Sequence, residues 1–401
     1  MQKKLFILVT LFVMIASSVS AQGTTSGIFG LVTSNGESVS GATVTATHQP
    51  SGTVYRAVTN IDGRFTIQGM RVGGPYQVEI SYIGNKPKVF NNVELRLGET
   101  EDLSCTLQAD ARELQEVVVT GNAGINGTKT GAAQSLNAQQ INDMPTISHS
   151  IADVARLNPQ LTTTNSGVMS FAGTNNRYNQ LLIDGAANND VFGLSSTGSN
   201  GGQAGTQPVS LETIEQIQVN VAPFDVRQSG FTGGSVNAIT KSGTNQFHGS
   251  AYGYGYNQNL LGHHYQLADG SGYAPKYNKE KDYNWGLTLG GPIIKDKLFF
   301  FANLEKNDKS YPNLYAYGSS QSQVDMTVAD DIVSKLKNIA AKQGVNYPGA
   351  FSTEDIYTKS TKAGVKLDWN INESNKFTIR WSLVDAKQLN NGGGIRALND
   401  N

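Results

Sequence analysis

The chain has 401 residues, of which 44 are Gly, 11 are Pro and one is Cys, and its formal net charge is -1. The 31 Lys and Arg balance 32 Asp and Glu without a long run of either sign, so we expect no nucleic-acid partner, which would need a clustered basic face. A single Cys excludes a disulfide scaffold and a zinc site built from Cys alone. Charged residues are 16% of the chain, below the ~25% of an average soluble protein, which is unlike an ordinary cytosolic enzyme.

Residues 1–21 have the pattern of a secretory signal peptide. Lys3 and Lys4 are basic, residues 5–16 form an apolar core, and Val19-Ser20-Ala21 satisfies the small-x-small rule for cleavage before Gln22. The apolar run is shorter than the ~20 residues of a transmembrane helix, so an anchor is the weaker interpretation. The sequence is compatible with a membrane β-barrel, because barrel strands need only an alternating pattern of apolar and polar residues.

Residues 22–108 are predicted to form a small β-sandwich. Short apolar runs separated by turn residues recur at 27–32, 42–46, 55–58, 64–67 and 76–80. Asp62-Gly63 lies between two alternating runs and predicts a hairpin with a type I′ turn. A calcium loop at 60–63 is disfavoured because further carboxylates are missing. Cys105 is expected to be a small buried hydrophobic residue.

The motifs of this region resemble the carboxypeptidase-regulatory-like domain. The similarity rests on Gly30 with Val32 and on the segments 41–44, 59–65 and 82–84. The resemblance implies a non-catalytic sandwich, and the stretch offers no set of zinc ligands for a regulated peptidase.

Residues 109–135 are predicted to be a linker that contains an isolated strand. Three consecutive β-branched residues at 117–119 favour a strand, which either joins the sandwich or adds to a sheet edge of another protein. The run lies after the sandwich and before a tether rich in Gly, Asn, Ser and Thr, which favours the second interpretation. It is similar to the Ton box of TonB-dependent outer-membrane receptors. The resemblance implies that TonB, with its inner-membrane energy-coupling proteins, binds Glu116, Val117, Val118, Val119 and Thr120.

Residues 136–241 resemble the plug domain of the same family. Residues 138–144 and 151–157 are expected to be helical, and the motifs at 178–185, 214–219 and 233–241 carry the similarity. The segment 223–231 replaces the usual short Tyr-Gly segment and is similar to the Oar-like branch, which argues against a siderophore substrate. The residues implied for the plug-barrel motif are Arg227, Gly233, Gly234 and Asn237. We expect the glycine pair to allow close packing of backbone against the barrel wall.

Two segments of this domain are expected to face the outer vestibule and meet ligand. One is the turn with Asp184, Gly185, Asn188, Asn189 and Asp190. The other is the Gly/Ser/Asn-rich loop at 193–207, which lacks the Lys-Ser/Thr ending of a phosphate-binding loop. An ordinary solvated loop is the alternative interpretation for both segments.

Residues 242–401 are predicted to be the start of a transmembrane antiparallel β-barrel. Apolar and polar residues alternate in 247–257, 284–289, 298–304 and 362–383, and long connections alternate with the short ones at 292–297 and 371–376. The tyrosine face of the first strand, with Tyr252, Tyr254 and Tyr256, is expected to contact the membrane interface.

Two features of the long connections invite separate interpretations. Apolar residues at helical spacing predict a helix at 327–344, with Thr327 and Asp330 as a capping box and Gly344 as its stop. His263-His264 suggests a metal, but neighbouring strand residues point to opposite faces and chelate poorly, so we expect no metal or other cofactor.

The expected fold class is mainly β: an N-terminal sandwich, an α+β plug and the first barrel strands. Five strands cannot close a barrel whose known minimum is ~8, so we expect an N-terminal part of a longer receptor in outer-membrane lipid, with sandwich and plug on the periplasmic side. The expected function is energy-coupled uptake of an unknown nutrient or peptide ligand, without enzymatic activity. The alternative is an outer-membrane adhesin or surface assembly factor without import.

Overall fold

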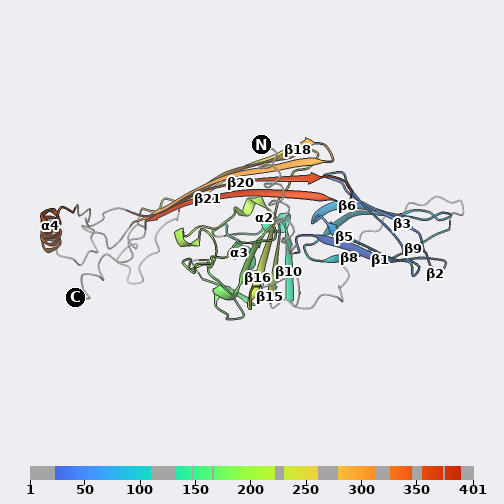
Figure 1. The fold of residues 1–401 in the computed structure, drawn as a ribbon, viewed down its shortest axis with the longest axis horizontal. Helices are drawn as coiled ribbons and strands as arrows, with labels where there is room; N and C mark the ends of the chain where they lie inside the picture. Colours follow the sequence, from blue (N-terminus) through green and yellow to red (C-terminus); the bar gives the residue numbers. More distant parts are fainter. Residues whose placement is uncertain are drawn as a thin grey trace, which may run out of the picture.

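The computed structural model describes residues 23–109, 132–146, 148–164, 167–221, 230–260, 279–312, 326–345, 355–373 and 375–389. The predicted signal peptide, the Ton-box run, Arg227 and His263-His264 lie outside these residues. Figure 1 shows a sandwich at one end, a plug sheet in the middle and a long sheet of barrel strands that runs over the plug and reaches the sandwich. The predicted fold class is confirmed, since strands dominate all three parts.

The N-terminal sandwich consists of two sheets that enclose an apolar core. One sheet has the order β2-β1-β5, with β8 and β9 also paired to β1, and the other has the order β4-β3-β6-β7. Ile28, Val44 and Ile80 are among the fully buried core residues. The strands are β1 (Ser26–Ser34), β2 (Glu37–Ser38), β3 (Thr43–His48), β4 (Thr53–Val58), β5 (Arg64–Met70), β6 (Gly73–Ser81), β7 (Lys88–Leu95), β8 (Thr100–Asp102) and β9 (Cys105–Leu107).

The hairpin predicted at Asp62-Gly63 is wrong. β4 and β5, which flank it, pair with strands of different sheets, so the connection crosses from one layer of the sandwich to the other. Only Gly63 has a positive φ, 72°, and the side-chain oxygen of Asn60 accepts hydrogen bonds from the backbone N–H groups of Asp62 and Arg64. An Asn-centred turn therefore takes the place of the type I′ turn.

The plug has a mixed five-stranded sheet of order β10-β15-β16-β13-β14. β10 is an edge strand that pairs with β15, while β13 and β16 are parallel. Both predicted helices are present, shorter than expected, and each begins with a capping box, at Asn137 and at Ser150. The elements are β10 (Ala132–Asn137), α2 (Ala138–Asn142), α3 (Ile151–Ala155), β11 (Leu161–Thr163), β12 (Met169–Phe171), η1 (Asn176–Tyr178), β13 (Gln180–Ile183), β14 (Ala186–Ala187), η2 (Gly202–Ala204), η3 (Leu211–Thr213), β15 (Ile214–Val221) and β16 (Gly234–Thr240).

The barrel wall is a five-stranded antiparallel sheet in sequence order, open within the described residues. Its strands are β17 (His248–Asn257), β18 (Lys281–Ile294), β19 (Leu298–Tyr311), β20 (Ile356–Asn370) and β21 (Lys376–Leu389). The short turns lie at the end nearest the sandwich, where Asn370 contacts Thr53. Because short turns are periplasmic in this class of barrel, the sandwich lies at the periplasmic end.

The two faces of the wall differ as the sequence predicts. Apolar residues project outward as an exposed band suited to lipid, while Glu305, Lys362 and Lys366 are buried on the inner face beside the plug. The exposed band includes Trp285, Leu287, Leu289, Val365, Trp369, Phe377, Ile379, Trp381 and Leu383.

The predicted external helix is α4 (Met326–Lys342), and Gly344 follows it with a φ of 70°. Thr327 lies inside its first turn rather than before it. Val328, Ile332 and Ile339 on its apolar side are exposed, so no described residue covers that side. None of the helices in the described part of the chain is long and apolar enough to cross a bilayer.

Candidate functional site: the plug against the barrel wall

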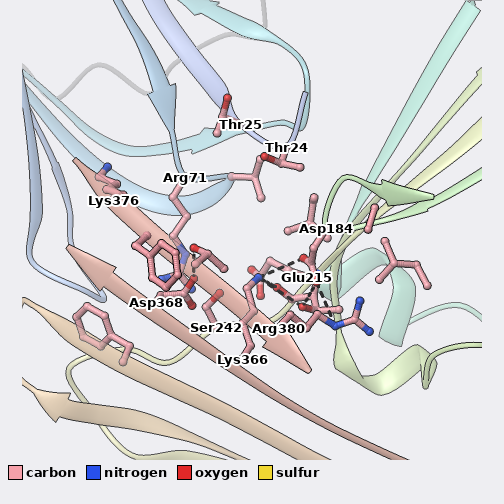
Figure 2. Close-up of a pocket in the computed structure, with 18 of the residues that line it drawn as sticks. Thr24, Thr25, Arg71, Asp184, Glu215, Ser242, Lys366, Asp368, Lys376 and Arg380 are labelled. Atoms are coloured by element: carbon pink, nitrogen blue, oxygen red, sulfur yellow. Dashed lines mark hydrogen bonds and ion pairs between the residues drawn. The ribbon is translucent and has the colours of Figure 1, made fainter. Parts of the chain in front are cut away.

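Asp184 joins the plug sheet to the inner face of the barrel wall. It follows β13 directly, and its carboxylate accepts hydrogen bonds from the backbone N–H and the hydroxyl of Thr240, at 2.9 and 2.6 Å. Lys366 Nζ on β20 lies 3.2 Å from one carboxylate oxygen, and Arg380 Nε on β21 lies 3.4 Å from the other. Figure 2 shows the three charged groups converging. Asp184 is therefore a paired plug-barrel contact, and its carboxylate faces the wall.

A second buried polar cluster lies between η3 and the barrel wall. Lys362 Nζ is 2.8 Å from Glu305 Oε1, and the two side chains are 6% and 4% exposed. Ser210 of the plug and Tyr252 of β17 both donate hydroxyl hydrogen bonds to Glu305. The paired charges have the additional hydrogen bonds that a buried ion pair needs to offset its desolvation.

The expected membrane contact of the tyrosine face is wrong. Tyr252 points inward to Glu305, and Tyr254 donates its hydroxyl to Glu212 of the plug and stacks on His149, with ring centroids 3.8 Å apart. The reason is that buried phenol groups need polar partners, which the plug supplies and lipid does not. The opposite, glycine-rich face of β17 shares the outer side with Trp285 and Leu287 of β18.

Three other predicted ligand-facing residues, Asn188, Asn189 and Asp190, form hydrogen bonds within plug residues 179–195. Asn189 accepts a hydrogen bond from the backbone N–H of Leu181 and donates to the carbonyl of Asn179, which ties the loop to β13. Asn188 donates to the carbonyl of Ala186, and Gly185 has a φ of 80°. The carboxylate of Asp190 accepts backbone hydrogen bonds, that of Ser195 above all, which lowers its pKa.

The structure separates two segments that the sequence interpretation grouped together. Asp184 and Asn188 border a cavity at the sandwich end of the wall, so the expectation that they face the outer vestibule is wrong. The segment around η2 lies near the opposite ends of the strands, where the Thr206 hydroxyl is 3.2 Å from that of Ser360. Because β20 begins at the outer end, this second segment lies in the outer half of the wall, as expected for a vestibule loop.

The sequence interpretation missed three exposed apolar residues in the plug loop after Asp190. Val191, Phe192 and Leu194 are 85%, 83% and 66% exposed. Asp190 holds this tip by accepting hydrogen bonds from the N–H groups of Phe192 and Ser195. The sequence contains a pattern that could have identified them, because these three apolar residues interrupt a stretch rich in Gly, Ser and Asn.

The glycine pair of the plug-barrel motif does not pack against the barrel wall. A Cβ at Gly234 would meet the ring of Phe171, and one at Gly233 would meet Asn179, both within the plug. The close approach to the wall occurs instead at Gly243, where a Cβ would meet the carbonyl oxygens of Phe300 and Gly291. Gly243 follows the motif, at the point where the chain leaves the plug.

Asn237, the last residue of that motif, lies on β16 and is 2% exposed. Its amide donates to the carbonyl of Gly23 at 3.1 Å. The contact is with the segment before β1, so Asn237 joins the plug to the sandwich.

A cavity of about 600 Å³ lies where sandwich, plug and barrel wall meet. Figure 2 shows Thr24, Thr25 and Arg71 on one side of it, Asp184 and Glu215 on another, and Lys366, Asp368 and Arg380 on the wall. The lining mixes cations and anions, unlike the mainly apolar lining of a typical small-molecule pocket.

Three family models match the chain in succession. They are a carboxypeptidase regulatory-like domain at residues 27–108, a TonB-dependent receptor plug domain at 126–236 and an outer membrane beta barrel domain at 239–320. Their order agrees with the sandwich, plug sheet and barrel wall of the fold.

Among curated proteins, the chain is 26% identical over 326 residues to the TonB-dependent transporter Oar of Myxococcus xanthus, covering 76% of this chain and 30% of Oar. It is 25% identical over 229 residues to PirA of Acinetobacter baumannii, a probable TonB-dependent siderophore receptor, covering 52% of this chain and 28% of PirA. The chain thus spans about 30% of the length of these relatives.

Solved structures that match part of the chain include the siderophore receptor PirA of Acinetobacter baumannii, with a TM-score of 0.40 and 19% identity over 65% of this chain and 32% of that one. The ferric enterobactin receptor PfeA of Pseudomonas aeruginosa has a TM-score of 0.41 and 15% identity, over 65% of this chain and 33% of that one.

The plug and barrel matches and the similarity to Oar therefore confirm two predictions. These are the resemblance to TonB-dependent receptors and the outer-membrane location. The relatives are receptors and transporters rather than enzymes. The chain belongs to the TonB-dependent outer-membrane receptors and carries a carboxypeptidase regulatory-like domain in front of its plug.

Proposed function

We propose that this receptor imports a nutrient ligand by energy-coupled opening of its plug. The observation that carries the proposal is the buried set of plug-barrel contacts: Asp184 with Lys366 and Arg380, and Ser210 with Glu305. Buried charges are costly to separate from their partners, so such a plug needs an energy supply to move. The outer membrane has none of its own, which makes a coupling partner necessary.

The proposed coupling partner is TonB, acting with its inner-membrane energy-coupling proteins. The run Glu116, Val117, Val118, Val119 and Thr120 would add as a strand to a sheet edge of TonB. It precedes β10 in the chain, and in the described part of the plug β10 is an edge strand paired with β15. A pull on this run therefore acts on an edge strand of the plug sheet.

The proposed ligand contacts are the plug loops. Asn189 and Asp190 hold the loop whose tip exposes Val191 and Phe192. A tip that combines apolar side chains with a polar frame suits a ligand with both characters, such as an oligopeptide. A siderophore, which the name of PirA indicates for that relative, is the other ligand class to test.

Deleting Val117–Val119 tests the coupling. We expect loss of uptake of a labelled oligopeptide or ferric siderophore that the intact receptor imports, with unchanged binding of the same compound at the cell surface. A deletion of equal length at 122–124, within the tether, is the matched control and should retain uptake. Full uptake without residues 117–119 would refute the proposal.

A surface adhesin or assembly factor predicts a different result. Its activity would be the same in cells with and without TonB. Loss of the receptor's phenotype when TonB is removed distinguishes import from this alternative.

A further inference from the structure

The sandwich is docked on the plug through polar side chains that are buried in the contact. The amide of Gln216 accepts a hydrogen bond from Leu97 N at 2.8 Å and donates to the Leu95 carbonyl at 3.0 Å. Gln218 donates to the Leu97 carbonyl at 2.7 Å. Both glutamines are 2–3% exposed, so the sandwich covers the face of β15 that is turned away from the plug core.

The sandwich also contacts the periplasmic turns of the barrel wall. Asn370 donates to the Thr53 hydroxyl at 3.0 Å, and Lys376 Nζ lies 3.4 Å from the centre of the Tyr55 ring. Arg56 forms an ion pair with Glu373, which lies in the turn between β20 and β21. The sandwich thus bridges the plug and the rim of the barrel wall.

The apolar part of this docking contact is small. Among buried residues, a separate cluster of Val72, Leu97 and Ile239 joins sandwich and plug, whereas each domain has a much larger core of its own. Contacts between domains that are rich in hydrogen bonds and poor in apolar area resemble transient interfaces. The contact is therefore built to separate without unfolding either domain.

The sandwich forms one side of the cavity between the plug and the barrel wall. Tyr55 and Arg71 line it from the sandwich, opposite Asp184 and Lys366, as Figure 2 shows for the labelled residues. Arg71 also donates to the Gly243 carbonyl at 3.3 Å, at the exit of the chain from the plug. A ligand that passes between Asp184 and the wall toward the periplasm would enter this cavity and contact the sandwich.

We propose that the sandwich is a periplasmic gate, which closes the space between plug and barrel wall while docked and must move aside before this space opens to the periplasm. The gate rests on the proposed import function for its purpose. Its closure is a separate physical claim, which is measurable without a ligand and without TonB.

The test uses a cysteine reporter in the cavity of the intact receptor. Ser242 is 8% exposed and lines the cavity, so Ser242→Cys places the reporter there. Cys105→Ser removes the single cysteine of residues 1–401. Outer-membrane fragments open on the periplasmic side are treated with a bulky PEG-maleimide. Adding Gln216→Ala and Gln218→Ala removes three docking hydrogen bonds, and we expect labelling to be about tenfold faster. Gln139→Ala, at an exposed glutamine, is the matched control and should leave the rate unchanged.

A reporter in the plug core keeps the result interpretable. Val236 is 0% exposed, so Val236→Cys stays unlabelled if the plug of the double glutamine variant is folded. If Val236→Cys is labelled, deletion of residues 23–108 replaces the glutamine variant as the undocked form. An unchanged Ser242→Cys rate in an undocked receptor with a folded plug would overturn the gate. Because these membranes contain neither TonB nor a nutrient, the result is independent of the Ton-box deletion.

Discussion

In the sandwich, strands such as β6 alternate between buried apolar and exposed polar residues, whereas β15 and β16 of the plug are buried along both faces. One face of the plug strands packs Ile217, Val219 and Val236 into the core, and the other carries Gln216 and Gln218. A sheet face that is buried and polar must be matched by donors and acceptors from a neighbour. The sandwich is therefore held together by hydrophobic burial, while the plug is held in place by directional polar contacts with its neighbours.

The largest expected effect comes from the polar side of this comparison. Lys362→Met leaves the buried Glu305 carboxylate without its cation, and we expect the receptor to lose about 3–5 kcal/mol of stability. The measurement is the temperature at which the folded receptor loses its compact migration in SDS gels. Lys359→Met, at an exposed lysine of the same strand, is the control. Equal effects of both substitutions would contradict a structural role for the buried pair.

The apolar side is tested in the sandwich core. Ile80→Ala at a fully buried position should destabilise the sandwich, residues 23–109, by about 2–5 kcal/mol, because it removes apolar contacts and leaves a cavity. Urea unfolding of the excised sandwich measures the change. Ile83→Ala, at a residue that is 94% exposed, should cost almost nothing. A similar loss for the two variants would show that the apolar core does not dominate.

A buried histidine makes the sandwich sensitive to acid. Burial, assisted by Arg71 and Lys376, lowers the pKa of His48 from 6.5 to about 3. The folded state therefore holds His48 neutral, and its contribution is present above the unfolded pKa and is lost as the pH falls below 6.5. We expect the free energy of unfolding of the sandwich to fall by about 2 kcal/mol between pH 7 and pH 5, as measured by thermal unfolding. His48→Gln should flatten this part of the pH dependence, and an unchanged slope would exclude His48 as its source.

The smallest effect is expected at the rim of the docking contact. Arg56 and Glu373 are 52% and 64% exposed, so Arg56→Glu should weaken docking by less than about 1 kcal/mol and only at low salt. Labelling of Ser242→Cys at two salt concentrations measures this change. The double exchange Arg56→Glu with Glu373→Arg should restore the original rate. A large, salt-independent effect would mean that this pair is more than a surface contact.

Most of the fold could be predicted from local sequence patterns. Alternation at Trp285, Leu287 and Leu289 identified a lipid-facing strand, and the apolar runs of residues 27–80 identified the sandwich. These predictions succeed because strand period and burial on one face leave a direct trace in the order of residues. The plug helices were likewise found where Asn137 and Ser150 cap them.

The site could be predicted only in part. The pattern marks Asp184 and Asn237 as plug residues of interest, but it cannot tell that Asp184 pairs with Lys366 and Arg380, which lie 182 and 196 residues later in the chain. Alternation separates the two faces of β17 without saying which one meets lipid, so Tyr252 and Tyr254 were assigned to the wrong side.

Local patterns in the sequence predict the order of the three domains and the outward apolar band of the barrel wall. Only the tertiary structure decided which polar groups meet: Gln216 and Gln218 with the sandwich, and Ser210 and Tyr252 with Glu305. The physical reason is that hydrophobic burial follows from local periodicity, whereas a hydrogen bond or ion pair depends on partners that are distant in the chain.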